Sequence, residues 1–265
     1  MPYTSRPPVG RLRGIVDRLW HVEDAGAWSA PETICPDGRT EIVLHLADPM
    51  CERVGDAARP QPRYLLVGQM AAPIMVVPTG RVAMVGARLE PGALYRLMHI
   101  PQQRLAGQVH DLEAVWSGWT RRAVAQVGEV EGAPERLVAL ERALESLIPA
   151  GSPEGSGRFL DVAVQRLQAS GGTASIERLA HQAGISRRQF ERRFLEHVGL
   201  PPRLFGRLVR FQRAFHALGT ESGASIAARC GYADQAHLVR EIRRFSGQTP
   251  TLLAEAHGLT AFFRD

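Results

Sequence analysis

Apolar and polar residues follow different patterns along the chain, and each pattern predicts a different kind of element. Between about residues 38 and 90, short apolar runs bounded by proline and glycine predict strands at Glu41–Ala47, Tyr64–Met70, Ile74–Val77 and Val82–Leu89. Several short strands separated by turn residues are typical of a small antiparallel sheet or barrel. Residues 64–80 carry no charge, but their prolines and glycines favour two strands over a membrane span.

Past Pro91-Gly92 the apolar residues take the spacing of helices. One helix is predicted over Asp111–Val127, with Asp111 as its N-cap, and another over Pro134–Ile148. The second helix carries an apolar stripe of Leu137, Leu140, Leu144, Leu147 and Ile148. This stripe fits a dimerisation surface, and it fits burial inside the domain equally well.

A domain boundary is predicted near residue 150, where composition and charge change together. Ala150–Gly157 consists mostly of small, flexible residues, which is typical of a linker. Residues 1–157 hold 16 arginines against 18 acidic residues, whereas residues 158–265 hold 16 against 9, and the chain contains no lysine. We therefore expect a sensor or dimerisation domain at 1–150, a linker at 151–157, and a basic domain at 158–265 that meets a polyanion.

The basic domain contains an internal repeat. Leu179-Ala180-x2-Ala183-Gly184-Ile185 resembles Ile226-Ala227-x2-Cys230-Gly231-Tyr232 at an offset of 47 residues. Each copy continues with a matching series spaced by 4, 5 and 3 residues: Phe190, Phe194, Gly199 and Pro202 in the first, and Leu238, Ile242, Gly247 and Pro250 in the second. A match of this length with one inserted residue indicates a duplicated structural unit.

Each copy predicts a helix, a tight turn and a second helix. The shared positions are a small residue where the helices cross, a turn glycine, an apolar plug and a capping side chain: Ala180, Gly184, Ile185 and Ser186, then Ala227, Gly231, Tyr232 and Asp234. Ser175 caps the first helix of the first unit, and Ser222 or Ser225 that of the second. This is the layout of a helix-turn-helix, whose second helix enters the major groove of DNA.

The outward faces of the two second helices carry the residues that we expect to meet DNA. They are Arg187, Arg188, Glu191 and Arg192 in the first unit, and Gln235, His237, Val239, Arg240, Arg243 and Arg244 in the second. Arginine presents a planar pair of donors to guanine, glutamine pairs with adenine, and valine contacts the thymine methyl group. Phosphate contact is the alternative for the arginines, and His237 fits a capping or packing role better than base reading.

Between the two units, Pro201-Pro202 starts a further helix with the apolar stripe Leu204, Leu208, Phe211, Phe215 and Leu218. Its seventeen residues would span roughly 25 Å at about 1.5 Å each. A rod of this length would hold two reading heads near successive turns of the major groove, which are about 34 Å apart. Arg193, Arg207 and Arg210 are expected either to contact DNA or to pair with Glu191 or Glu196.

Residues 173–253 resemble the DNA-binding domain of the AraC/XylS family of bacterial transcription regulators. The matching positions are Leu179-Ala180, Gly184-Ile185-Ser186, Phe190-x3-Phe194, Gly199-x2-Pro202, Arg210, Ala214, Cys230-Gly231-Tyr232-x-Asp234, Arg240 and Gly247-x-Thr249-Pro250. The resemblance implies two helix-turn-helix subdomains joined by a long helix. Two departures are Ile242, where the family usually has phenylalanine, and the glycine-bearing first helix of the second unit, at Gly223.

The N-terminal part resembles, over fewer residues, a cupin-like sensor domain that precedes such DNA-binding domains. The matching residues are Pro36-Asp37-Gly38, Glu41-Ile-Val-Leu, Leu66-Val67-Gly68 and Arg88-x2-Pro91-Gly92. The resemblance implies binding of a small molecule or dimerisation. The expected fold class is α+β, with a cupin-like sheet or barrel and helices in the N-terminal domain and an all-α C-terminal domain.

The remaining chemistry-bearing residues show no enzyme signature. There is no glycine-rich phosphate loop, no Ser/His/Asp set and no cysteine nucleophile motif, and the spacing of His45, His99 and His110 does not fit a metal site. The expectation is therefore no catalysis, no cofactor and no metal. Cys230 is expected as a small buried residue. The four tryptophans fit core packing better than a ligand pocket: Trp20, Trp28, Trp116 and Trp119.

These observations predict a cytoplasmic, bacterial transcription regulator. Three cysteines far apart and a start without an apolar signal segment favour the reducing cytoplasm. The expected partners are double-stranded DNA and RNA polymerase, with a small-molecule effector or a homodimer as alternatives for control, and no membrane. Two rival interpretations are a β-barrel enzyme with a DNA-binding appendage and a small-molecule binding module with a degenerate DNA domain.

Overall fold

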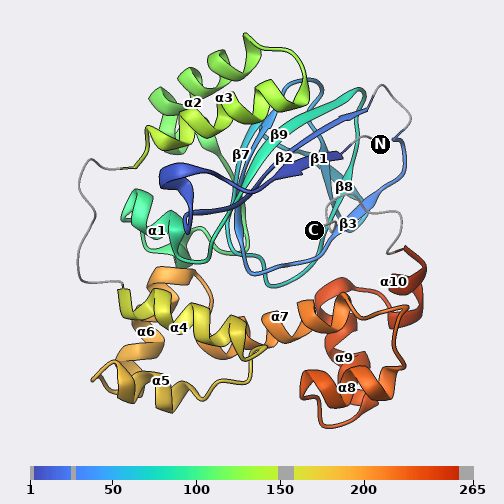
Figure 1. The fold of residues 1–265 in the computed structure, drawn as a ribbon. Coiled ribbons are helices and arrows are strands. Elements are labelled where there is room, and N and C mark those ends of the chain that lie inside the picture. Colours follow the sequence, from blue (N-terminus) through green and yellow to red (C-terminus); the bar gives the residue numbers. More distant parts are fainter. Residues whose placement is uncertain (1–2, 25–27, 149–157, 257–265) are drawn as a thin grey trace.

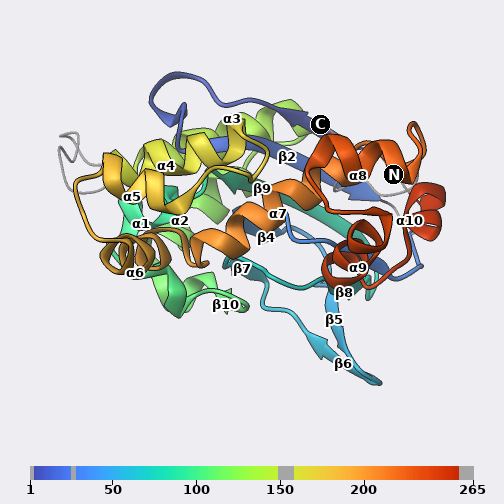
Figure 2. The same ribbon diagram turned by 90° about the horizontal axis from the view of Figure 1, so that it is seen from below.

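The computed structural model describes residues 3–24, 28–148 and 158–256 (Figure 1). The predicted linker 151–157 lies outside the described residues. A β-rich N-terminal domain, with helices on its outer side, stands on a helical C-terminal domain. The two views show the C-terminal helices in a row along one edge of the N-terminal domain (Figure 2).

The N-terminal domain contains two antiparallel sheets. The larger has the strand order β1 (Tyr3–Arg6), β2 (Val16–Asp24), β9 (Val82–Leu89), β4 (Thr40–His45), β7 (Tyr64–Val67) and β10 (Val109–Asp111). The smaller has the order β3 (Glu32–Ile34), β8 (Ile74–Val77), β5 (Cys51–Val54) and β6 (Ala57–Pro60). The four predicted strands correspond to β4, β7, β8 and β9. Among the described strands the two sheets remain separate. Of the two predicted forms, a sheet or a barrel, the N-terminal domain therefore does not form a closed barrel.

The two faces of β4 contribute to different cores because successive side chains of a strand point to opposite sides. Ile42 and Leu44 belong to the core between the larger sheet and helices α2 (Leu112–Gly128) and α3 (Ala133–Glu145). Val43 belongs to a second core, which includes Trp20 of β2 and Val76 of the smaller sheet. The larger sheet is therefore covered by helices on one face and by the smaller sheet on the other.

Helix α2 begins as predicted, with the Asp111 carboxylate accepting a hydrogen bond from the Glu113 backbone N–H at 2.9 Å. The predicted stripe on α3 is buried inside the domain: Leu137, Leu140 and Leu144 belong to the helix-facing core, and Leu147 and Ile148 pack against it. Its role as a dimerisation surface is therefore wrong, because the sheet and α2 already cover it. Three shorter elements complete the domain: η1 (Gly10–Leu12), α1 (Ala93–Met98) and η2 (Gln102–Arg104).

The C-terminal domain is helical in its described residues. Its helices are α4 (Arg158–Ala169), α5 (Ile176–Gln182), α6 (Arg187–Val198), α7 (Pro202–Phe215), α8 (Gly223–Cys230), α9 (Gln235–Ser246) and α10 (Pro250–Ala256). The predicted helix between the units is shorter than expected. Helix α7 has 14 residues, about 21 Å at the usual rise, and Leu218 is buried beyond its end. Phe205, not Leu204, begins its fully buried stripe.

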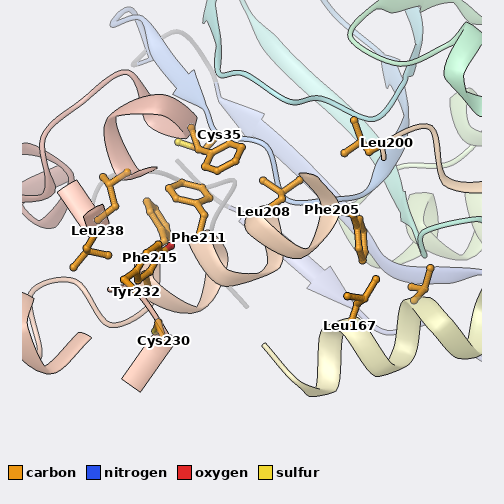
Figure 3. Packing of buried hydrophobic residues seen from close by; sticks show 14 of the residues in the cluster. Cys35, Leu167, Leu200, Phe205, Leu208, Phe211, Phe215, Cys230, Tyr232 and Leu238 are labelled. Atoms are coloured by element: carbon orange, nitrogen blue, oxygen red, sulfur yellow. The ribbon is translucent and has the colours of Figure 1, made fainter. Parts of the chain in front are cut away.

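One apolar cluster joins α4 to α10 and centres on α7 (Figure 3). Phe205, Leu208 and Phe211 of α7 are each at most 1% exposed. Cys230 is buried in the same cluster, as predicted for a small apolar residue. One member comes from the other domain, since Cys35 follows β3 and is buried with the α7 side chains. The core of the C-terminal domain thus includes an N-terminal residue.

Polar contacts hold the two domains together at both ends of this interface. Arg96 of α1 forms a salt bridge with Asp161 of α4 at 2.5 Å, and the same carboxylate lies 3.0 Å from Nε2 of His197. At the other end, the Gln212 side-chain amide donates to the Pro36 carbonyl at 2.6 Å. Within the described residues, no helix is both long and apolar enough to cross a membrane.

The burial of the α3 stripe leads to the first prediction. Leu140→Ala removes a fully buried side chain, so we expect the free energy of unfolding to fall by about 2–5 kcal/mol. The matched control, Val138→Ala on the outer side of α3, should change it by no more than about 0.5 kcal/mol. Urea unfolding measures both values. Equal effects of the two substitutions would contradict the placement of the stripe in the core.

Candidate nucleic-acid interface

The first predicted helix-turn-helix forms from α5 and α6, and local side chains define both helix starts. Ser175 accepts a hydrogen bond from the Arg178 backbone N–H at 3.3 Å, as predicted for its N-cap. Ser186 caps α6 in a capping box: its hydroxyl accepts from the Gln189 backbone N–H, and Gln189 Oε1 accepts from the Ser186 backbone N–H at 3.2 Å. These bonds satisfy helix N–H groups that have no partner within the helix, so they fix the residues at which α5 and α6 begin.

The two turns have the same backbone geometry. Gly184 and Gly231 both have positive φ, at 67° and 73°, which glycine adopts without steric cost. After each glycine, the plug residue donates its backbone N–H to the small crossing residue, from Ile185 to Ala180 at 3.2 Å and from Tyr232 to Ala227 at 2.9 Å. The repeat predicted from sequence spacing is therefore a repeat of hydrogen bonding as well.

The second unit follows the same plan in α8 and α9. Ser222, and not Ser225, caps α8, by accepting from the Ser225 N–H at 3.2 Å. Asp234 caps α9 by accepting from the His237 N–H at 2.6 Å. Leu238 and Ile242 are buried below α9, as Phe190 and Phe194 are below α6. The smaller Ile242 is fully buried, so this departure from the family pattern is accommodated.

The outer face of α6 carries two exposed arginines and a third arginine that is paired with acidic side chains of the same domain. Arg188 and Arg192 are exposed. Arg187 instead donates to Glu191 at 2.9 Å and to Glu177 at 2.8 Å, and the bond to Glu191 raises its pKa above the usual arginine range. The four predicted residues of this helix thus lie together, but Arg187 and Glu191 neutralise each other in the absence of DNA.

The outer face of α9 is more basic along its length. Gln235, Arg240, Arg243 and Arg244 are exposed, and Val239 is half-buried beside them. His237 occupies the helix cap: its ring accepts from the Ala233 N–H at 3.4 Å and packs edge-on against Tyr232 at a centroid distance of 5.3 Å. This contact gives His237 the capping and packing geometry that its sequence position favours.

Three arginines near the interface have partners other than Glu191 or Glu196, the predicted ones. Arg207 of α7 forms a two-bond salt bridge with Glu241 of α9, at 2.6 and 2.8 Å. Arg210 lies over the Tyr232 ring and donates to the Gly231 carbonyl at 3.3 Å. Arg193 lies over the ring of Phe159. These residues brace the units against α7 and α4. Because Arg207 and Glu241 lie 34 residues apart, no local spacing rule signals their pairing.

The pair between Arg207 and Glu241 is held inside the C-terminal domain. Glu241 is buried, and burial alone would raise the pKa of its carboxyl group. The hydrogen bonds and positive charge of Arg207, together with His237 and Arg244, outweigh that effect and hold the pKa of Glu241 below its usual value. The pair fixes α9 against α7.

A second candidate site lies between the two sheets of the N-terminal domain. A cavity of about 830 Å³, counted to its mouth, is lined by apolar residues of both sheets and by the segment Ile34–Asp37. Trp20 lines it, whereas Trp119 packs in the helix-facing core and donates to the Ala143 carbonyl at 2.8 Å. The described residues contain no group of three or more His, Cys, Asp or Glu side chains placed to hold a metal ion.

Two families match separate parts of this chain. Residues 179–256 match a helix-turn-helix domain, and residues 4–111 match a domain of unknown function, DUF6597. No curated protein shows a significant match to the chain.

Solved structures resemble the chain in part or over its whole length. A transcriptional regulator with an AraC-type DNA-binding domain from Chromobacterium violaceum is 28% identical over 40% of this chain and 96% of its own, with a TM-score of 0.37. The DNA-binding domain of AdpA, a global transcriptional factor solved with a target DNA, is 29% identical over 38% and 90%, at 0.33. An apo variant of ToxT from Vibrio cholerae is 8% identical over 94% and 99%, at 0.50, which shows a shared two-domain fold.

The duplicated turn geometry and the domain match define the class of protein. The C-terminal domain is an AraC-type helix-turn-helix domain, which confirms the resemblance drawn from the repeat. The chain is a DNA-binding transcription regulator of this type, with a DUF6597 domain at its N-terminus.

The salt bridge between α7 and α9 leads to the second prediction. Arg207→Ala should lower the free energy of unfolding by about 1–2 kcal/mol at neutral pH, because Glu241 loses its partner while remaining buried. Since the folded-state pKa of Glu241 is lowered, the contribution is complete above the unfolded value of 4.5 and is lost as pH falls through the folded value.

Unfolding at pH 7 and near pH 3 measures this difference, with exposed Arg203→Ala on the same helix as the control. The loss caused by Arg207→Ala should shrink at the lower pH, and the control should stay near the wild type at both. A loss that is the same at both pH values would show that the pair does not stabilise the domain.

Proposed function

We propose that this regulator reads an operator with both helix-turn-helix units, each placing its second helix in a major groove. The observation that carries this proposal is the duplicated unit, with the same cap, turn and plug in both copies and arginines exposed on both second helices. Exposed arginines favour DNA contact, since they keep their donors available.

The residues of α6 and α9 divide into base readers and phosphate contacts in this proposal. Arg188 and Arg192 are the guanine readers of the first unit, with Glu191 as the acceptor for a cytosine amino group. Glu191 is supported in this role by Arg187, which fixes its carboxylate. The Glu191 carboxylate can keep its bond from Arg187 and also accept from cytosine, because a carboxylate accepts several hydrogen bonds at once.

In the second unit, Gln235 reads adenine, Val239 contacts a thymine methyl group, and Arg240 reads guanine. Arg243 and Arg244 lie one turn further along α9, toward its C-terminal end, so they serve as phosphate contacts. His237 keeps the helix start in place, because its ring is already engaged by Ala233 and Tyr232.

The N-terminal domain controls DNA binding in this proposal, and a small molecule is favoured over dimerisation as the means. The cavity between the sheets supports a small-molecule site. The stripe that would have supported a dimer is buried inside the domain. The helix-turn-helix match likewise favours a regulator over the rival of a β-barrel enzyme with a DNA-binding appendage.

Selection of bound sequences from a random duplex pool, at two salt concentrations, tests the reading of two grooves. We expect a motif of two boxes whose centres lie about 10 base pairs apart, one turn of the duplex. Affinity should fall as salt rises, because arginine–phosphate contacts release counterions. Enrichment of no sequence, with binding that vanishes at moderate salt, would mean that the domain binds polyanions without reading them.

Substitution of single readers gives the third prediction. Arg188→Ala and Arg240→Ala should each weaken binding to the selected operator by about 1–3 kcal/mol, and each should relax preference in its own box only. Arg53→Ala, an exposed arginine of β5 far from α6 in the sequence, is the control and should leave operator affinity unchanged. Fluorescence anisotropy with operators mutated in one box measures this. Unchanged affinity in both variants would refute these reading positions.

A further inference from the structure

The cavity between the sheets has the lining of a ligand site, with apolar walls and a few polar side chains. Its empty space, counted to the open mouth, is about 830 Å³. Trp20, Met50 and Met84 line its apolar part, with Ile74 and Val76 of the smaller sheet opposite. A flat apolar body is suited to this lining, because a tryptophan ring and flexible methionines adapt to such a shape.

A buried polar side chain faces the same cavity without a hydrogen-bond partner. His45 is 1% exposed, and among the described residues neither of its ring nitrogens has a partner. Burial, with Arg63 nearby, lowers the pKa of His45 to about 4, so the ring is neutral and one nitrogen accepts hydrogen bonds. A buried acceptor without a donor is unfavourable, and a donor on a ligand would remove that cost.

Glu41 adds a second acceptor on the same face of β4, since it lies four residues before His45, with Val43 between them. Its oxygen is 3.6 Å from the guanidinium of Arg88, beyond hydrogen-bond distance. Burial, together with the carboxylates of Asp37 and Asp17, raises the pKa of Glu41, although Arg88 acts against this effect. The two acceptors thus face one cavity from the same side of β4, at either side of Val43.

The charges around Glu41 are unequal in the described part of the chain. Four carboxylates, those of Asp17, Asp37, Glu41 and Glu90, share two guanidinium groups. Arg39 is held by Asp17 at 2.9 Å, and Arg88 is held by Asp37 at 2.5 Å. An anionic ligand would add to the acidic excess, whereas a cation would reduce it.

One wall of the cavity is also a contact surface for α7. The segment Ile34–Arg39 lines the cavity through Cys35, Pro36 and Asp37. From the same segment, Cys35 enters the core of the C-terminal domain, and the Pro36 carbonyl accepts from Gln212 of α7. Figure 3 shows Cys35 on the N-terminal side of the cluster, above the α7 residues.

The next residues of the segment are equally close to the helix. A Cβ atom on Gly38 would lie 3.3 Å from the Phe205 ring, so the backbone approaches α7 directly. The Gly38 carbonyl accepts from the buried Gln69 side chain at 2.7 Å, on the N-terminal side. The segment is thus held between the cavity and the helix that carries both reading units.

From this geometry we propose that the cavity binds an apolar amine, with its ammonium group at Glu41. The Ile34–Arg39 segment transmits its occupancy to α7. This inference rests on the proposed function for its readout in DNA affinity, but the ligand site stands without it. A molecule in the cavity presses on the segment from one side while Gln212 and Phe205 hold the other, so occupancy changes how α7 and the reading helices are held.

Three probes that differ in one group test the ligand class on the full-length chain. They are 2-phenylethylamine, 2-phenylethanol and phenylacetate, and binding is measured by titration calorimetry. The amine should bind about tenfold or more tighter than the alcohol, the factor expected for a charge-assisted hydrogen bond in a buried site. Phenylacetate should bind most weakly. Preference for phenylacetate, or no binding by any probe, would overturn the ligand class.

Glu41→Gln removes the charge but keeps the shape, and it should reduce the preference for the amine over the alcohol to about threefold or less. Glu32→Gln is the matched control, because Glu32 is a buried acid on β3 that does not line the cavity. If Glu41→Gln fails to fold, Met84→Trp fills the cavity and should abolish binding of all three probes. An amine preference unchanged in Glu41→Gln, or binding that survives in Met84→Trp, would refute the site.

Gln212→Ala tests the relay and gives the fourth prediction. In the wild type, saturating amine should change operator affinity by about fivefold or more, a typical coupling between two sites. In Gln212→Ala the amine should bind with unchanged affinity but alter operator affinity less than about twofold. The same amine acts on the same DNA in both proteins, so its effects on DNA itself cancel.

The outcomes separate the two proposals. Amine binding without any change in operator affinity in the wild type would overturn the relay and leave the ligand site. An equal change in the wild type and Gln212→Ala would show that the signal does not pass through the Pro36 contact. Loss of specific DNA binding in all samples, with amine binding intact, would refute the proposed function and not the ligand class.

Discussion

The C-terminal domain depends on the burial of one side of α7. Helices α5 and α8 have seven and eight residues, too short to be stable in water by themselves. They keep their structure because α6 and α9 pack with them on the aromatic side of α7, where Phe211 meets Phe245 at 5.2 Å. A change that moves α7 therefore moves both units together.

The length of α7 sets only part of the spacing between the reading helices. Its 14 residues rise about 21 Å, less than the roughly 34 Å of one DNA turn. In the proposed two-groove binding, the difference would come from the units at its two ends, since packed helix axes lie about 8–10 Å apart. Arg207 and Glu241 contribute to this spacing, because they fix where α9 crosses α7.

The C-terminal domain was predictable from sequence because its signals are local and occur twice. The capping residue, the turn glycine and the apolar stripe lie within about 25 residues in each unit. Because the same pattern occurs a second time, a chance match of the first is excluded. Four strands were predictable for a similar reason, since each is an apolar run between turn residues. Strand β2 was not, because Leu19, Trp20 and Val22 are buried beside His21, so the period of two is lost.

Other features have no local signal at all. Every residue of β6 is exposed, and it is a strand only through its backbone pairing with β5. The pair of Arg207 with Glu241 and the contact of Gln212 with Pro36 join residues 34 and 176 positions apart. The exposure of Arg188 and Arg192 followed from helical spacing, whereas the pairing of Arg187 with Glu177 crosses from one helix to the next. Periodicity predicts which side of a helix is buried, not which helix covers it.

The two domains of this regulator share a core, and this limits how independent they can be. Cys35 contributes an N-terminal side chain to the cluster around α7, so separating the domains would expose apolar surface on both. Two polar contacts between the domains in the described residues each have an alternative in water: Asp161 with Arg96, and Gln212 with Pro36. Burial of Cys35 opposes complete separation of the domains, whereas water can replace the polar contacts beside it. The interface therefore favours small shifts over separation. The two reading helices would then be adjusted by sliding of α7 under the N-terminal domain, a motion that keeps the shared core closed.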